Sequence, residues 1–241
     1  MKLSIVIPCF NEAENIPLLL KSINDVYNPD TEIILVDNGS TDDTFSILSN
    51  ELKSVNNTLI RSVRVEKNIG YGHGIIAGIN EAKGEIIAWT HADLQTDIKD
   101  VYCGFEMFNN QSNQEKTFLK GSRQARSIID NVLTWGMGII SSLILGEKLN
   151  DINAQPKMFH RSFLMMANDP PDDFSLDLYV YCIAVKNKMN IQELPVYFKD
   201  RLYGKAKGGG GSSIWTRIKV IKRTLKYILK LSKQRIQATG S

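Results

Sequence analysis

The sequence holds only three cysteines, and they lie far apart at Cys9, Cys103 and Cys182. It has no CxxC pair and no histidine near a cysteine at metal-ligand spacing. These absences argue against a disulfide framework and a zinc site, and they suit a reducing, cytoplasmic location. The chain begins with a short strand-like run and lacks the longer apolar core of a signal peptide, so we do not expect export.

The chain also lacks an apolar run of about 20 residues, the length that a transmembrane helix requires. Its most apolar stretch, residues 131–146, is sixteen residues long and is expected to form a buried or interfacial helix. No internal repeat is visible. The single low-complexity segment, GGGG at 208–211, is expected to act as a flexible hinge.

Acidic residues are missing from the end of the chain: residues 201–241 carry eleven lysines and arginines and no acid. The net charge of +3 therefore divides into −8 before residue 201 and +11 after it. Apolar side chains recur at helical spacing within residues 214–236, which predicts a basic amphipathic helix on an anionic membrane surface. The alternative is a helix packed on the body with a solvated basic face. No nucleic-acid-binding motif accompanies the charge, so we expect no nucleic acid partner.

Apolar runs alternate with helical patterns in the first part of the chain, and its 241 residues suit one large domain. The expected strands are residues 3–8, 32–37, 59–65 and 85–90, and the expected helices are 14–26, 41–54 and 72–82. This alternation predicts an α/β fold of the Rossmann-like kind, with a mainly parallel sheet and helices on both faces.

The pattern is less regular after residue 97. We expect helices near 98–108 and 175–188 and strands near 117–121, 150–158 and 191–198. The chain then divides into a domain over 1–200, with a nucleotide-binding half (1–95) and an acceptor-side half (96–200), a flexible basic loop (201–213) and the amphipathic helix (214–236).

Polar clusters follow each of the first four expected strands. They are Pro8-Cys9-Phe10-Asn11-Glu12, Asp37-Asn38-Gly39, Lys67-Asn68-Ile69-Gly70 and His91-Ala92-Asp93-Leu94-Gln95. Open α/β sheets bind ligands outside the carboxyl ends of their strands, so these clusters should share one rim. Asp93 and Gln95 present two hard oxygen ligands there, which suits Mg²⁺ or Mn²⁺ bridging a diphosphate.

Some of these residues have two interpretations. Asp37 ends a buried strand, so its carboxylate needs a hydrogen-bond donor. The donor is either a nucleobase or ribose group of a ligand, or the backbone of the turn that follows the strand. Glu12 either contacts a ligand or caps the first helix, and Asp42 is expected to stabilise the start of the second. The glycines of 70–74 lack dinucleotide-loop spacing and are expected to permit close backbone packing against a nucleotide or a neighbouring loop.

The segments IPCFNEAENI, VDNGSTDDT and HADLQ, in this order, resemble the inverting family 2 of GT-A glycosyltransferases. The resemblance is strongest to its polyprenyl-phosphate glycosyltransferases, similar to dolichol-phosphate mannose synthase, and covers about residues 1–210. It implies a GT-A fold and a nucleoside-diphosphate-sugar donor. The nucleotide-sugar-binding residues would then be Pro8, Phe10, Glu12, Asp37, Asn68, His91, Ala92, Asp93 and Arg123, with Asp93 and Gln95 holding the metal.

The resemblance extends to a loop in which Arg201 and Lys207 would close over the donor diphosphate and the acceptor phosphate. The sequence departs from the family at His91, where aspartate is usual, and in the 151–156 segment on the acceptor side. Asp151 and Asp177 are the further carboxylates expected near the reaction centre.

These features predict transfer of a sugar, with inversion, to a polyprenyl-phosphate or glycolipid acceptor by an enzyme peripheral on the inner face of the membrane. A phosphate acceptor needs no strong base, whereas a sugar hydroxyl does, and Asp177 would then supply it. The alternatives are therefore transfer to a sugar hydroxyl in surface polysaccharide or glycolipid assembly, and a module that binds a sugar nucleotide without reacting.

Overall fold

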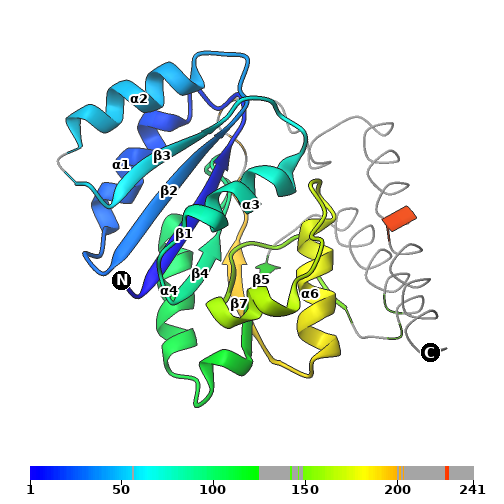
Figure 1. The fold of residues 1–241 in the computed structure, drawn as a ribbon. Helices are drawn as coiled ribbons and strands as arrows, with labels where there is room; N and C mark the ends of the chain where they lie inside the picture. Colours follow the sequence, from blue (N-terminus) through cyan, green and yellow to red (C-terminus); the bar gives the residue numbers. More distant parts are fainter. Residues whose placement is uncertain are drawn as a thin grey trace.

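The computed structural model describes residues 1–55, 57–124, 142, 146, 149–199, 201, 203 and 226–227. In this part of the chain a seven-stranded sheet has helices on both faces; in Figure 1, α1 and α2 are at the left, α3 crosses over β1 and β4, and α6 is at the right. The strand order is β3-β2-β1-β4-β6-β5-β7. Within this sheet β6 runs antiparallel to β4 and β5, and the other pairs are parallel.

The first half is a series of strand-helix units. Its elements are β1 (Leu3–Cys9), α1 (Ile16–Val26), β2 (Thr31–Asn38), α2 (Thr44–Ser54), β3 (Ile60–Val65), α3 (Tyr71–Glu81) and β4 (Ile86–Trp89). The register pairs Cys9 with Asp37 and Val6 with Trp89, so the strands end close to one another. The loops that follow β1, β2, β3 and β4 therefore meet at one rim of the sheet.

The second half continues the same sheet. Its elements are α4 (Ile98–Asn109), η1 (Gln114–Lys116), β5 (Thr117–Gln124), β6 (Lys157–His160), η2 (Arg161–Met166), α6 (Leu176–Lys186) and β7 (Asn190–Tyr197). Strand β6 lies between β4 and β5, so residues 151–156, which precede β6, are delivered to the same rim as the ends of β4 and β5. The two halves thus both contribute to that rim.

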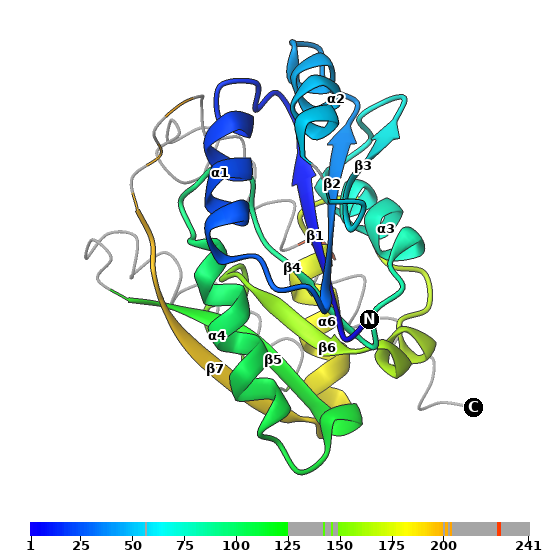
Figure 2. The ribbon, with the colours of Figure 1, turned by 90° about the vertical axis from the view of Figure 1, so that its left-hand side faces the viewer.

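Each face of the sheet carries its own apolar core. Helices α1 and α4 pack on the face that contains Ile5 and Ile7, whereas α3 and α6 pack on the face that contains Val6 and Trp89. Figure 2 shows α1 and α4 on the near side and α6 behind the strands. Burial of both faces explains why the first strands read as continuous apolar runs.

Most of the expected elements are confirmed within one to three residues at each end. The strand expected over 150–158 is wrong, because β6 begins only at Lys157. The carbonyl groups of Ile152 and Ala154 accept hydrogen bonds from the ammonium of Lys157, so they are not available to a strand ladder. Pro156, which has no N–H, follows directly.

Three expectations fall largely outside the described residues. They are the apolar helix over 131–146, the basic loop over 201–213 and the amphipathic helix over 214–236. In the ranges that the structure does describe, no helix combines the length and apolar character needed to cross a bilayer.

Candidate active site

A cavity of about 440 Å³ opens at the rim where the strands of the first half end. Its walls come from the segments after β1, β3, β4 and β7, from the ends of β2 and β5, and from the segment that leads into α6. The lining residues are Pro8, Phe10, Glu12, Asn38, Asn68, Ile69, Gly70, Tyr71, His91, Ala92, Asp93, Gln95, Arg123, Asn153, Asp173, Phe174, Asp177, Phe198 and Arg201.

The loop after β1 is held by the loop after β2. Asn11 adopts a left-handed φ of 54°, its backbone N–H donates to Ser40 Oγ at 3.1 Å, and its Oδ1 accepts from the backbone N–H of Thr41 at 2.8 Å. The backbone N–H of Glu12 donates to Thr44 Oγ1 at 2.8 Å. These bonds fix the positions of Phe10 and Glu12 on the cavity wall.

Asp93 is the centre of the polar side of the cavity. Its Oδ1 accepts from the backbone N–H of Gln95 at 3.1 Å, and its Oδ2 accepts from Arg201 Nη2 at 2.8 Å. The same guanidinium lies 3.4 Å from Glu12 Oε1. Burial acts to raise the pKa of Asp93, but the charges of His91 and Arg201 and its hydrogen bonds outweigh burial and hold that pKa below its ordinary value. Asp93 is therefore an anion at neutral pH.

Asp177, in the first turn of α6, is held through one of its carboxylate oxygens. Its Oδ1 accepts from Trp89 Nε1 at 3.2 Å and from Gln155 Nε2 at 2.9 Å, and it lies 3.9 Å from Lys157 Nζ. In the described part of the chain these contacts all end on Oδ1, which leaves Oδ2 for a ligand. Asp177 is nearly fully buried yet lines the cavity.

Arg123, at the end of β5, is paired with Asp151. The backbone N–H and Nε of Arg123 donate to the two carboxylate oxygens at 2.7 and 2.8 Å, and Nη2 makes a further contact with Oδ1. Burial acts to raise the pKa of Asp151, but the hydrogen bonds and charge of Arg123 lower it overall. The pair fixes a cationic side chain on the acceptor-side wall.

Three rings form one wall of the cavity. Tyr71 stacks on Phe174 with centroids 4.8 Å apart and an interplanar angle of 8°, and it lies 5.8 Å from the His91 ring. A Cβ at Gly70 or Gly72 would lie 2.1 Å from Asp172 O or 2.3 Å from Pro171 O. The expectation that these glycines permit close backbone packing against a neighbouring loop is therefore confirmed.

Asp37 and Lys207 are the two expected site residues that the structure does not bring to this cavity. Asp37 is fully buried behind the rim, accepts from the backbone N–H of Ser40 at 3.1 Å and lies 3.5 Å from Arg64 Nε. Its neighbour Asn38 lines the cavity instead. Lys207 lies outside the described residues. The other expected site residues all contribute to the lining: Pro8, Phe10, Glu12, Asn68, His91, Ala92, Asp93, Gln95, Arg123, Asp177 and Arg201.

Asp42 stabilises the start of α2, as expected. Its Oδ1 accepts from the backbone N–H and the hydroxyl of Thr44, the first residue of that helix. Its carboxylate is therefore accounted for by local structure.

Sequence reasoning missed several residues of the site. Phe174, Phe198 and Asn153 line it, and Gln155 and Lys157 hold Asp177. The segment PPDDF, which precedes α6, places an aromatic residue beside two acids at the start of a helix. This pattern could have indicated that Phe174 belongs to the site. Lys157 gave none, because a single lysine in a short apolar run looks like a strand residue facing solvent.

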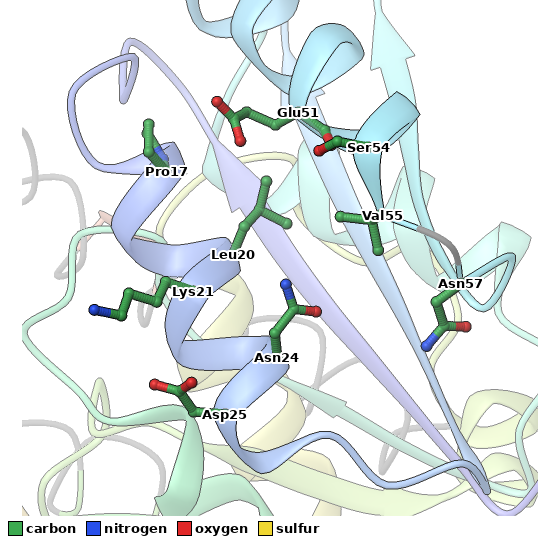
Figure 3. A pocket seen from close by; sticks show the side chains of 9 residues that line it. All are labelled: Pro17, Leu20, Lys21, Asn24, Asp25, Glu51, Ser54, Val55 and Asn57. Atoms are coloured by element: carbon green, nitrogen blue, oxygen red, sulfur yellow. The ribbon is translucent and has the colours of Figure 1, made fainter.

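A second cavity of about 480 Å³ lies between α1 and α2, as Figure 3 shows. It is lined by Pro17, Leu20, Lys21, Asn24, Asp25, Glu51, Ser54, Val55 and Asn57. None of these residues belongs to a cluster that follows the carboxyl end of a strand. We therefore assign the active site to the rim cavity.

The family model for glycosyl transferase family 2 matches residues 4–170, and the chain belongs to this family. Among solved structures, glucosyl-3-phosphoglycerate synthase from Mycobacterium tuberculosis in complex with UDP has a TM-score of 0.71 at 16% identity, over 96% of this chain and 80% of that one. The same enzyme with Mn²⁺, UDP and glucosyl-3-phosphoglycerate has a TM-score of 0.69 at 16% identity, over 96% and 79%. The expected GT-A fold is thereby confirmed.

Two relatives share more sequence with the chain. A dodecaprenyl-phosphate galacturonate synthase from Rhizobium johnstonii is 31% identical over 172 residues, which is 68% of this chain and 49% of that protein. An undecaprenyl-phosphate 4-deoxy-4-formamido-L-arabinose transferase from Enterobacter sp. (strain 638) is 25% identical over 219 residues, which is 86% and 62%. The chain thus spans about half to three fifths of the length of these relatives.

Proposed function

We propose that this chain transfers a sugar, with inversion, from a nucleoside-diphosphate sugar to a polyprenyl-phosphate acceptor at the inner face of the membrane. One observation carries the proposal: Asp93, Gln95 and Arg201 lie together on the wall of a cavity at the ends of the strands. A carboxylate, an amide and a guanidinium at one place suit a diphosphate and its counter-ion. The family and the names of the relatives support the same chemistry.

The donor nucleoside would bind beside Pro8, Phe10 and Glu12, with Asn68 and the backbone of Ala92 as further contacts. Asn38 faces this space while Asp37 lies behind it, so we assign direct contact with the base to Asn38 and support of the loop to Asp37. The rings of Tyr71 and His91, 5.8 Å apart, line the cavity together with Asp93 and would flank the sugar.

The residues present fit a divalent metal ion that arrives with a diphosphate. Among the described residues, no three His, Cys, Asp or Glu side chains are placed so that they could hold one metal ion between them. Asp93 supplies a carboxylate, and Gln95 an amide oxygen, because its Nε2 already donates to Lys199 O at 3.2 Å. Mg²⁺ and Mn²⁺ accept one or two protein ligands completed by phosphate and water oxygens. An ion held by Asp93 and Gln95 would supply positive charge that stabilises a nucleoside diphosphate leaving group.

The chain's own residues do the remaining work. Arg201 lines the cavity beside Asp93, so its guanidinium can neutralise charge that develops on the leaving group. Lys207 is proposed to assist from the same segment. Arg123 is held by Asp151 on the acceptor-side wall, where it suits an acceptor phosphate.

The names of the relatives and the basic C-terminal segment support the acceptor and the location. The relatives are named for dodecaprenyl- and undecaprenyl-phosphate, which supports a lipid phosphate acceptor. The basic residues of 214–236 would attach the chain peripherally to an anionic leaflet. Binding to vesicles with and without anionic lipid, measured by sedimentation, tests this attachment.

The central experiment incubates the chain with labelled nucleoside-diphosphate sugars, Mg²⁺ or Mn²⁺, and undecaprenyl phosphate in detergent. We expect one donor to yield a labelled, acid-labile lipid of inverted anomeric configuration, and a chelator to prevent its formation. Donor binding without product under every condition would instead identify a module that holds a sugar nucleotide without reacting.

A second candidate is transfer to a sugar hydroxyl, because the carboxylate of Asp177 lines the cavity. A hydroxyl nucleophile needs a base, whereas a phosphate is already an anion. Asp177→Asn separates the two candidates. Because Asp177 is also held by Trp89, Gln155 and Lys157, a loss of turnover of about tenfold or less fits a phosphate acceptor, and a loss of about 100-fold or more with unchanged donor binding fits a hydroxyl acceptor that needs a base.

A further inference from the structure

Lys157, the first residue of β6, is a fully buried lysine beneath the active site. Its Nζ donates to Ile152 O at 2.9 Å and also to Ala154 O, and it lies 3.9 Å from Asp177 Oδ1. Lysine is almost never fully buried unless it is paired. The ammonium here is satisfied by two carbonyls and one carboxylate.

Those two carbonyls belong to the loop that supplies the acceptor-side wall. Asp151 in this loop holds Arg123, Asn153 lines the cavity, and Gln155 Nε2 donates to Asp177 at 2.9 Å and to Tyr71 Oη at 3.2 Å. Lys157 therefore contacts the loop at Ile152 and Ala154, the two residues that alternate with Asp151, Asn153 and Gln155. Removal of its amino group would release both the loop and the carboxylate of Asp177.

We propose that Lys157 is a positioning residue for the transfer reaction, whose protonated ammonium holds the 151–155 loop and Asp177 in the arrangement that the acceptor half requires. The proposal rests on the proposed glycosyl transfer. It assigns Lys157 no contact with substrate, because it lies behind Asp177 and does not line the cavity.

Charged groups face Lys157 from α6, from β5 and from its own loop, whereas β4 places the uncharged Trp89 beside it. Asp177 faces it from α6, Lys120 and Arg123 from β5, and Asp151 from its own loop. Glu193 of β7 lies 3.5 Å from Lys120 Nζ and offsets that second cation.

Burial lowers the pKa of Lys157 to about 8, and repulsion by Lys120 and Arg123 adds to this, while Asp177 and Asp151 oppose it. Lys157 is thus protonated below about pH 8 and becomes neutral above it. A neutral amine still donates to a carbonyl but no longer compensates Asp177. We therefore expect turnover to fall as the pH rises through about 8.

The test compares the pH profile of kcat in wild type, Lys157→Arg and Lys157→Met. Arginine stays charged throughout, so K157R should lose the alkaline decline and keep turnover within about tenfold of wild type at pH 7. K157M should turn over at least about tenfold more slowly at every pH, with an unchanged KM for the donor. Lys53→Met, the same change at an exposed lysine of α2, is the matched control and should behave as wild type.

The proposal is overturned if K157R retains the wild-type alkaline decline, or if K157M has wild-type turnover. An inactive wild type with every donor would instead overturn the proposed function. If neither variant folds, wild-type protein labelled with ¹³C-lysine decides the matter. The resonance of one lysine ε-carbon must then shift with a midpoint at the pH where activity is half lost. The proposal is contradicted if no lysine ε-carbon titrates below about pH 9.

Discussion

Arg201 Nη2 lies 2.8 Å from Asp93 Oδ2, although the two residues are 108 positions apart in the chain. The contact is set up by the backbone, because Lys199 N–H donates to Gln95 O at 2.8 Å and Gln95 Nε2 donates to Lys199 O at 3.2 Å. The segment after β7 is thus attached to the loop after β4. Arg201 consequently occupies one oxygen of the carboxylate to which we assign a divalent metal ion.

Replacement of Arg201 should therefore improve metal binding while it impairs transfer. Without nucleotide, Arg201→Gln should bind Mn²⁺ about tenfold more tightly, since a competing charge near the surface is worth on the order of 1–4 kcal/mol. Turnover should fall about 100-fold, because a cation facing the leaving group is lost. Mn²⁺ electron paramagnetic resonance measures the first effect and a product assay the second.

Lys199→Gln is the control for that prediction, because it removes the same charge two residues away. Its side chain is exposed and pairs with Asp97 at 3.3 Å, so Mn²⁺ affinity should stay within about twofold of wild type. Equal gains in the two variants would mean that general charge, and not the contact with Asp93, controls metal binding.

Asp93→Asn should remove metal-dependent binding of the donor. In wild type, a nucleoside diphosphate at about 100 times its Kd should stabilise the fold by about 2.7 kcal/mol in the presence of Mn²⁺. The variant keeps the shape of the side chain but loses the anion, so Mn²⁺ should add nothing to its melting temperature. Asp97→Asn, at a half-buried position in the same segment that does not line the cavity, should keep the wild-type response to Mn²⁺.

Two glycines should respond in opposite directions to alanine. A Cβ at Gly78 in α3 would lie 2.4 Å from Val6 Cγ1 and 2.8 Å from Val36 Cγ2, two fixed side chains of the central sheet. Gly78→Ala should lower the free energy of unfolding by about 1–2 kcal/mol, because overpacking exceeds the gain in helix propensity. At Gly104 in α4 the nearest atom is Leu119 Cδ2 at 3.2 Å, the end of a flexible side chain. Gly104→Ala should be neutral or stabilising by up to about 1 kcal/mol in urea unfolding.

The first half of the fold could be predicted because local sequence decides it. Apolar runs such as β2, buried along its whole length, and the polar residues at its end leave few alternatives to a buried parallel strand. The rim followed from topology, so residues as far apart as Phe10 and Asp93 were expected to meet. The choice between Asp37 and Asn38 was not accessible, because neighbouring residues of a strand point to opposite sides and the sequence does not say which side faces the ligand.

The acceptor side was harder for a physical reason. The conformation of the 151–156 segment depends on side chains that are distant in sequence. Arg123 donates a hydrogen bond to Asp151, and Gln155 donates one to Asp177. Such contacts leave no periodic pattern, and the segment was expected to be a strand. The pairing of Arg201 with Asp93 was likewise invisible, although both residues were expected in the site.

Asp151 should make stability depend on acid pH. Its pKa is lowered in the folded state, because Arg123 outweighs burial, so the unfolded chain binds more protons as the pH falls. The pair therefore stabilises the fold fully above about pH 4, the pKa of an unfolded aspartate, and the contribution is lost as the pH falls through the lower folded pKa. Asp151→Asn should lower the free energy of unfolding by about 2–3 kcal/mol at pH 7, and its deficit should shrink toward pH 3. Urea unfolding at several pH values measures this difference, and a deficit that stays constant down to pH 3 would show that the ion pair does not account for it.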